Sequence, residues 1–207
     1  MKDLFKGCWT IPNLLSFLRI LVIPVFAYFF VKGDALWAIV MLALSGVSDF
    51  LDGKIARKFN QVSDLGKVLD PVADKLTQIT LAVLLFTSFN SAQDETLKAF
   101  SWVFLVFVIK EAIMVLFGGL MIIIGLRPSA AEIFGKAATF AFYAIMLLVV
   151  AFGPEVGLLR TIMFELPSPL MMILVVLSAI LTIIAFVSYL PDTFRQFKEL
   201  KDKKKSK

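Results

Sequence analysis

The sequence predicts an all-α protein that crosses a membrane several times. Its 207 residues are 59% hydrophobic, with a mean hydropathy of +0.89, whereas soluble domains are about 45–50% apolar. Six apolar stretches divide the chain, and each approaches or exceeds the roughly 20 residues that a helix needs to cross a bilayer. We therefore expect one membrane domain over residues 1–207 with six transmembrane helices, at roughly 12–32, 35–57, 68–90, 99–125, 131–153 and 168–190.

Both ends of the chain carry positive charge beside apolar residues. Residues 1–8 place Lys2 and Lys6 close to apolar side chains, a pattern that favours a short helix lying at the membrane surface. Residues 195–207 form a basic tail. Such a tail can bind nucleic acid, but beside a membrane helix it is more typical of a cytoplasmic end near anionic lipid. We expect no nucleic-acid partner.

The distribution of Lys and Arg predicts the orientation in the membrane. An even number of spans places both termini on one side, and that side collects most of the positive charge. The opposite loops hold only Lys32, Lys98 and Arg160. Because cytoplasmic loops carry the excess of Lys and Arg, we expect both termini and the polar stretch 49–74 to face the cytoplasm, around a polar cavity that opens to that side.

Four of the five acids in the polar stretch form two close pairs. Asp49 and Asp52 are three residues apart, and Asp70 and Asp74 are four apart, so each pair lies on one face of a helix. A charge at the middle of a bilayer costs about 2.5–3.5 kcal/mol, which suggests that a cation compensates these acids. The chain has no His and one Cys, so oxygen ligands and hard cations such as Mg²⁺, Mn²⁺ or Ca²⁺ are favoured over Zn²⁺.

Small and basic residues accompany the acids at fixed spacing. Gly53, Ala56 and Gly66 lack bulky side chains, which would let a nucleotide approach the backbone, and Arg57 offers a planar fork to a phosphate. Pairing of the acids with nearby Lys and Arg would explain the charges, but it would not explain the small residues. The complete pattern has eight fixed positions: Asp49-x2-Asp52-Gly53-x2-Ala56-Arg57-x8-Gly66-x3-Asp70-x3-Asp74.

This pattern resembles the signature of the CDP-alcohol phosphotransferase family, most closely its bacterial phosphatidylglycerophosphate synthase branch. The resemblance implies a six-helix enzyme of phospholipid synthesis in the inner (plasma) membrane, acting as a homodimer among membrane lipids. It would transfer a phosphatidyl group from CDP-diacylglycerol to an acceptor hydroxyl, releasing CMP. Two Mg²⁺ or Mn²⁺ ions would be needed to neutralise the reacting oxygens. The resemblance makes Asp49, Asp52, Asp70 and Asp74 metal ligands, and Asp74 also the general base.

Other contacts follow from the same resemblance. The nucleotide would contact Asp52, Gly53, Ala56, Arg57, Gly66 and, on the first helix, Asn13. The alternative for Asn13 is that it caps this helix. Phosphate on the acceptor would meet Lys110, Arg127 and Lys136. The alternative is that these cations serve only as positive-inside anchors.

The identity of the acceptor rests on these cations. The branch usually has Arg-Glu where this chain has Lys110 and Glu111. Because adjacent residues on a helix point in different directions, we expect no direct ion pair between these two. Glycerol 3-phosphate is the favoured acceptor, followed by phosphatidylglycerol, which would give cardiolipin, and by inositol phosphate.

A divalent-cation transporter is the alternative of another class, since carboxylates within membranes also mark ion pathways. The acids of this chain, however, gather near one membrane face, and no inverted repeat accompanies them. Both observations favour the enzyme.

Overall fold

The computed structural model describes residues 10–58, 66–124, 126 and 133–205. This part of the chain contains helices and no strands, which confirms the all-α prediction. Residues 1–8, where we expected a surface helix, lie outside the description. The helices of the described part are α1 (Ile11–Lys32), α2 (Ala35–Lys58), α3 (Gly66–Asn90), α4 (Glu95–Phe100), α5 (Val103–Ile123), α6 (Ile133–Phe152) and α7 (Ser168–Lys205).

A two-residue turn folds α1 and α2 into an antiparallel pair. Gly33 has φ = 73°, a left-handed conformation that glycine adopts without a steric penalty. Its N–H donates to the carbonyl of Phe30 at 3.0 Å, and the N–H of Asp34 donates to the carbonyl of Phe29 at 3.0 Å. These two bonds form a Schellman motif that ends α1. The side chain of Asp34 then accepts the N–H of Trp37 at 3.5 Å and so begins α2.

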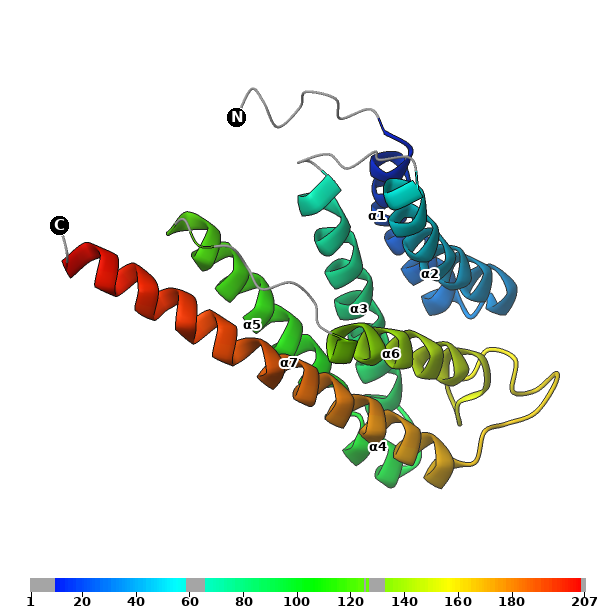
Figure 1. The fold of residues 1–207 in the computed structure, drawn as a ribbon. Coiled ribbons are helices and arrows are strands. Elements are labelled where there is room, and N and C mark those ends of the chain that lie inside the picture. The colour runs from blue at the N-terminus through cyan, green and yellow to red at the C-terminus, as the bar shows by residue number, and fades with distance from the viewer. Residues whose placement is uncertain (1–9, 59–65, 125, 127–132, 206–207) are drawn as a thin grey trace.

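The polar ends of three helices come together because of this turn. Figure 1 shows the start of α1, the end of α2 and the start of α3 at the same end of the bundle. α1 packs against both α2 and α3. The two acid pairs, at the end of α2 and the start of α3, therefore lie toward one end of the molecule, as the sequence predicts.

Aromatic side chains fill the space between the helices that follow. The rings of Phe89 in α3 and Phe104 in α5 stack with centroids 5.5 Å apart. Phe107 in α5 meets Phe142 in α6 edge to face at 5.0 Å. All four are at most 2% exposed, and such pairs stabilise packing by about 0.5–1.5 kcal/mol beyond their buried area. They join α3, α5 and α6 below the polar end.

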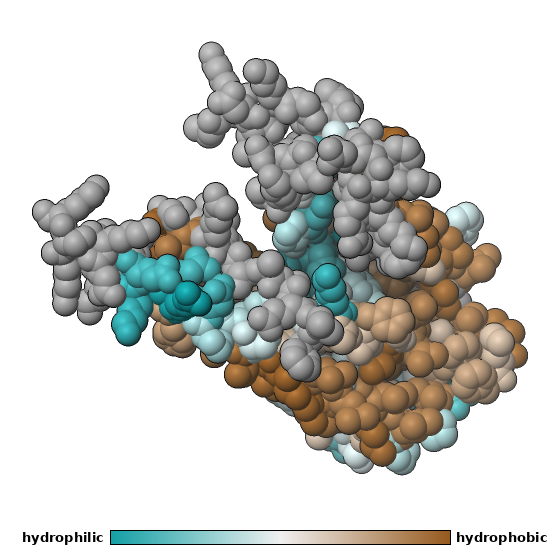
Figure 2. All heavy atoms as spheres, in the orientation of Figure 1, coloured by the Kyte–Doolittle hydropathy of each residue, from teal (hydrophilic) through white to brown (hydrophobic). Residues whose placement is uncertain are grey.

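The outer surface is suited to lipid. Among the described residues, five helical segments are long and apolar enough to cross a membrane, which identifies an integral membrane protein: Ile11–Lys32, Leu69–Asn90, Glu95–Met121, Gly135–Phe152 and Ser168–Glu199. In α2 the part whose side chains are described, Leu36–Ser48, is also an apolar helix. Figure 2 shows hydrophobic residues over most of the lower part of this face and hydrophilic residues above them.

Two helix boundaries differ from the prediction. The predicted helix over residues 99–125 is divided, because α4 ends at Phe100 and α5 begins at Val103. The hydroxyl of Ser101 donates to the carbonyl of Lys98 at 2.7 Å and supports this turn. The last helix was expected to stop near residue 190, but α7 continues through Pro191 to Lys205 and includes most of the basic tail.

Candidate active site

Asp70 and Asp74 lie one turn apart near the start of α3, and both are half-buried. The first residue of this helix, Gly66, is buried. The helical spacing predicted for this pair is therefore confirmed. The partners of the two carboxylates include side chains of α1, α3 itself and α6.

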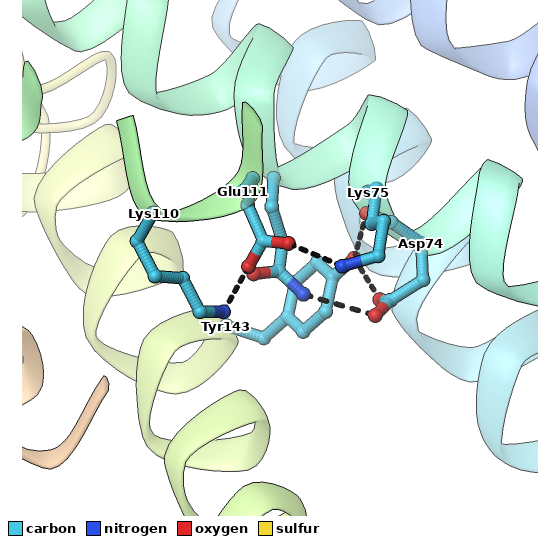
Figure 3. Close-up of polar contacts among 6 residues, drawn as sticks. Asp74, Lys75, Lys110, Glu111 and Tyr143 are labelled. Atoms are coloured by element: carbon cyan, nitrogen blue, oxygen red, sulfur yellow. Dashed lines mark hydrogen bonds and ion pairs between the residues drawn. The ribbon is translucent and has the colours of Figure 1, made fainter. Parts of the chain in front are cut away.

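Donors from two helices hold the carboxylate of Asp74. The hydroxyl of Tyr143, in α6, donates to Oδ1 at 2.9 Å. The amide Nε2 of Gln78, one turn further along α3, donates to Oδ2 at 3.0 Å. Figure 3 shows Tyr143 approaching Asp74 from the facing helix. Both oxygens of Asp74 thus accept a hydrogen bond.

Asp70 is held from the first helix. The hydroxyl of Ser16 in α1 lies against Oδ1 of Asp70 and 3.0 Å from the carbonyl oxygen of Pro12. A serine hydroxyl has one proton, so it donates to one of these oxygens at a time. Ser16 is fully buried, and its contact with Asp70 ties the start of α3 to α1.

A buried acid connects two lysines beside this pair. Glu111, in the middle of α5, is 2% exposed, and its Oε2 lies 2.7 Å from Nζ of Lys75 in α3. Its other oxygen contacts Nζ of Lys110. Figure 3 shows Glu111 between the two ammonium groups. Two positive charges share one negative charge, so the cluster keeps a net charge of about +1 next to Asp74.

The prediction that Lys110 and Glu111 form no direct ion pair is wrong. The rule behind it concerns the directions in which neighbouring side chains leave the helix. The four-carbon stem of lysine is long and flexible. It allows the ammonium of Lys110, 17% exposed, to reach the adjacent carboxylate.

The start of α1 contributes two buried polar residues. Thr10 caps the helix, and its side-chain oxygen accepts the N–H of Asn13 at 3.3 Å. Asn13 therefore does not cap α1, and that alternative is wrong. Its side chain is 5% exposed, and Arg19, about two turns further along, is 1% exposed. Both therefore place a polar side chain inside the bundle near its polar end.

The structure describes the remaining predicted site residues less completely. Asp49, Asp52, Gly53, Ala56 and Arg57 belong to the last turns of α2, but their side chains lie outside the description. Arg127 also lies outside the described residues. Lys136 is exposed in the first turn of α6. Their expected contacts stay predictions.

Comparison with known proteins gives this site a context. A family model described as CDP-alcohol phosphatidyltransferase matches residues 9–185. The chain belongs to the CDP-alcohol phosphatidyltransferase family. The matched region includes both acid pairs and the cluster formed by Lys75, Lys110 and Glu111.

Individual relatives of this CDP-alcohol phosphatidyltransferase carry two different names. A CMP-forming cardiolipin synthase of Streptomyces coelicolor is 40% identical over 152 residues, 70% of this chain and 66% of that protein. A CDP-diacylglycerol–glycerol-3-phosphate 3-phosphatidyltransferase of Aquifex aeolicus is 31% identical over 91% of this chain and 99% of its own length. A human CMP-forming cardiolipin synthase is 48% identical over 75 residues, 36% of this chain and 25% of that protein.

CDP-alcohol phosphatidyltransferases generally use divalent cations. The carboxylates of Asp70 and Asp74 offer the hard oxygen donors that such ions prefer. Among the described residues, no three acids or cysteines are close enough to hold a metal. The side chains of the other two predicted ligands lie outside that search. The described donors therefore fit a divalent cation, and the full ligand set stays a prediction.

Three residues of this site were absent from the prediction. Gln78 follows Asp74 by four residues, a helical spacing that could have indicated their contact. Tyr143 follows Lys136 by seven residues and so shares its face of α6, which is a weaker signal. Nothing in the sequence pairs Lys75 with an acid 36 residues away.

Proposed function

We propose that this protein transfers a phosphatidyl group from CDP-diacylglycerol to a hydroxyl of a glycerol-phosphate acceptor and releases CMP. The observation that carries the proposal is the carboxylate of Asp74, the last acid of the complete motif, fixed by donors beside a cluster of net positive charge. A fixed carboxylate suits a general base. The cations beside it suit an acceptor that carries phosphate.

In the proposed reaction the acceptor hydroxyl oxygen attacks the phosphorus that bears diacylglycerol. A new P–O bond forms, the pyrophosphate P–O bond breaks, and CMP leaves with that bridging oxygen. Asp74 accepts the proton of the attacking hydroxyl. Asp49, Asp52, Asp70 and Asp74 would hold the divalent cations, Mg²⁺ or Mn²⁺. When bound, these ions supply charge neutralisation at the attacking and leaving oxygens.

The nucleotide is proposed to bind at the polar end, between α1 and the end of α2. Gly53, Ala56 and Gly66 leave room for it, and Arg57 would pair with phosphate. The position of Asn13, buried near the start of α1, supports a contact with the nucleotide.

Glycerol 3-phosphate is the acceptor that we propose first, because the similarity to the Aquifex protein extends over most of both chains. Lys110, Arg127 and Lys136 would meet its phosphate, and the position of Lys75 beside Lys110 supports its addition to this set. Phosphatidylglycerol, which also contains a glycerol hydroxyl and a phosphate, is the second candidate because of the higher identity to cardiolipin synthases. Inositol phosphate would require the same cations.

The same proposal includes the number of transmembrane helices, the orientation in the membrane and the oligomeric state. The 24 residues of α2 would span about 36 Å, enough to make it a sixth transmembrane helix. Both termini and a polar cavity would then face the cytoplasm. The protein would lie in the inner membrane of the cell as a homodimer. Family membership favours this transferase over a divalent-cation transporter.

Release of CMP from purified protein tests the proposal directly. The protein in detergent receives CDP-diacylglycerol and Mg²⁺ or Mn²⁺, with glycerol 3-phosphate, phosphatidylglycerol, inositol phosphate or no acceptor. We expect release that requires glycerol 3-phosphate. Release that requires only phosphatidylglycerol would keep the reaction and replace the acceptor, whereas folded protein without any release would refute the proposed reaction.

A further inference from the structure

We propose that Tyr143 is a positioning residue for this reaction. Its hydroxyl, together with the amide of Gln78, holds the carboxylate of Asp74 in one orientation. The inference rests on the proposed function, because it requires Asp74 to act as the base. It gives α6, which carries none of the acids of the motif, a role in orienting the base.

The two hydrogen bonds act on opposite oxygens of one carboxylate. Tyr143 donates to Oδ1 at 2.9 Å and Gln78 to Oδ2 at 3.0 Å. Rotation of the carboxylate about its own axis would break both bonds together. The two donors therefore restrain the carboxylate from both of its oxygens.

The tyrosine hydroxyl is itself held in place by packing. The ring of Tyr143 meets Phe142 edge to face, with centroids 5.7 Å apart. Phe142 is 1% exposed and packs at 5.0 Å against Phe107 of α5. Tyrosine has two side-chain torsions to fix. The buried aromatic pair therefore sets where the hydroxyl of Tyr143 points.

Orientation of the base matters for the rate. A displacement of about 1 Å from productive geometry can cost about 100-fold in rate, and an unrestrained aspartate carboxylate turns freely about its last torsion. The gain from a fixed base appears in kcat. Substrate affinity changes little, since the bonds to Asp74 involve no substrate atom.

The alternative is that Tyr143 only joins α6 to α3. In that case loss of the hydroxyl would lower stability without a selective effect on the chemical step. The two roles therefore separate in a comparison of kcat, KM and thermal stability.

The test uses Tyr143→Phe in the full-length protein in detergent, which removes the hydroxyl and keeps the ring. We expect kcat for CMP release to fall about 10- to 100-fold, with KM for CDP-diacylglycerol within about twofold of the parent value. The thermal unfolding midpoint should stay unchanged. Gln78→Met, which removes the second donor with little change of shape, should give the same pattern.

Tyr28→Phe is the matched control. Tyr28 lies in α1, is 53% exposed, and its ring stacks under Nζ of Lys32, 4.6 Å from the centroid. The substitution keeps that ring, so activity should not change.

Each result separates the inference from the proposed function. An active parent protein with an equally active Tyr143→Phe variant would overturn the inference alone. A fall in kcat that is matched by a lower unfolding midpoint would also overturn it, in favour of the helix-joining role. A parent protein that is folded and releases no CMP would overturn the proposed function and the inference together.

Discussion

The proposed role of Asp74 as general base can be tested against a second aspartate of the chain, Asp192, as a control. Asp192 in α7 accepts a hydrogen bond at 3.0 Å from Gln196, four residues later, as Asp74 does from Gln78. Asp74→Asn should lower the rate of CMP release by about 10²–10⁴-fold, because the amide cannot take the proton. Asp192→Asn should have no effect. If Asp74→Asn retained activity, Asp74 would not be the general base.

Lys110 provides the test of acceptor binding. Lys110→Met should raise KM for glycerol 3-phosphate about 10- to 100-fold, since a hydrogen bond to a charged group contributes about 1.5–3 kcal/mol. KM for CDP-diacylglycerol should stay constant. Lys98→Met, at an exposed position of α4, is the control. An unchanged acceptor KM would place Lys110 outside the acceptor site.

Glu111 is expected to matter for stability. Glu111→Gln would leave the ammonium groups of Lys75 and Lys110 close together without their shared acid. Loss of one partner from a buried ion pair costs about 3–5 kcal/mol, so the thermal midpoint in detergent should fall sharply. Glu95→Gln removes a 3.4 Å pair between Glu95, 84% exposed, and Lys98, and should cost less than about 1 kcal/mol. Equal midpoints for the two variants would contradict the stabilising role of Glu111.

At single positions, the sequence predicted chemistry better than contacts. The spacing of Asp70 and Asp74 was enough to place both on one helix face. The contacts of Tyr143 with Asp74 and of Lys75 with Glu111 depend on how α3 meets α5 and α6. Helix packing, which no local spacing contains, decides those contacts.

At the scale of the elements, the turn between α1 and α2 controls where the acid pairs lie. Gly33→Ala should lower stability by about 1–2 kcal/mol, because a left-handed conformation is unfavourable for residues with Cβ. Space is not the cause, since a Cβ at Gly33 would meet no atom within 4 Å. Gly46→Ala, in α2 and equally free of contacts, should not destabilise the protein. Thermal unfolding of both variants would show whether the conformation of Gly33 is required.

Hydropathy located the helices well and their ends less well. It placed the first two helices within one residue of α1 and α2. It missed the break after Phe100, where the hydroxyl of Ser101 donates to the carbonyl of Lys98. Hydropathy also predicted that the last helix ends near residue 190, where the sequence stops being apolar, although α7 continues past Pro191. Polar residues can continue a helix beyond the lipid, so hydropathy marks the membrane boundary and leaves the helix boundary open.

At the scale of the whole molecule, the proposed cofactor gives the broadest test. Removal of divalent cations with a chelator should abolish CMP release, and Mg²⁺ or Mn²⁺ should restore it. The chain has no His and a single Cys, so Zn²⁺, which favours nitrogen and sulfur ligands, should restore less. Full activity in the presence of excess chelator would rule out the metal assignment.

Composition and motif together predicted the class of the molecule. High hydrophobicity indicated a membrane protein, and in the described part of the chain five helical segments have the length and composition to cross a bilayer. The motif indicated the family, which the match over residues 9–185 shows. The acceptor was not predicted to the same degree, because it depends on cations brought together from several helices.

The cluster of Lys75, Lys110 and Glu111 also has a consequence for membrane insertion during synthesis. Synthesis delivers α3 to the membrane before α5, so Lys75 arrives before Glu111. The charges of Lys110 and Glu111 at the centre of α5 would each enter lipid at a cost of about 2.5–3.5 kcal/mol, and pairing of Glu111 with Lys75 lowers that cost. We therefore expect α3 to wait at the insertion machinery until α5 emerges from the ribosome, and the two helices to enter the bilayer as a pair.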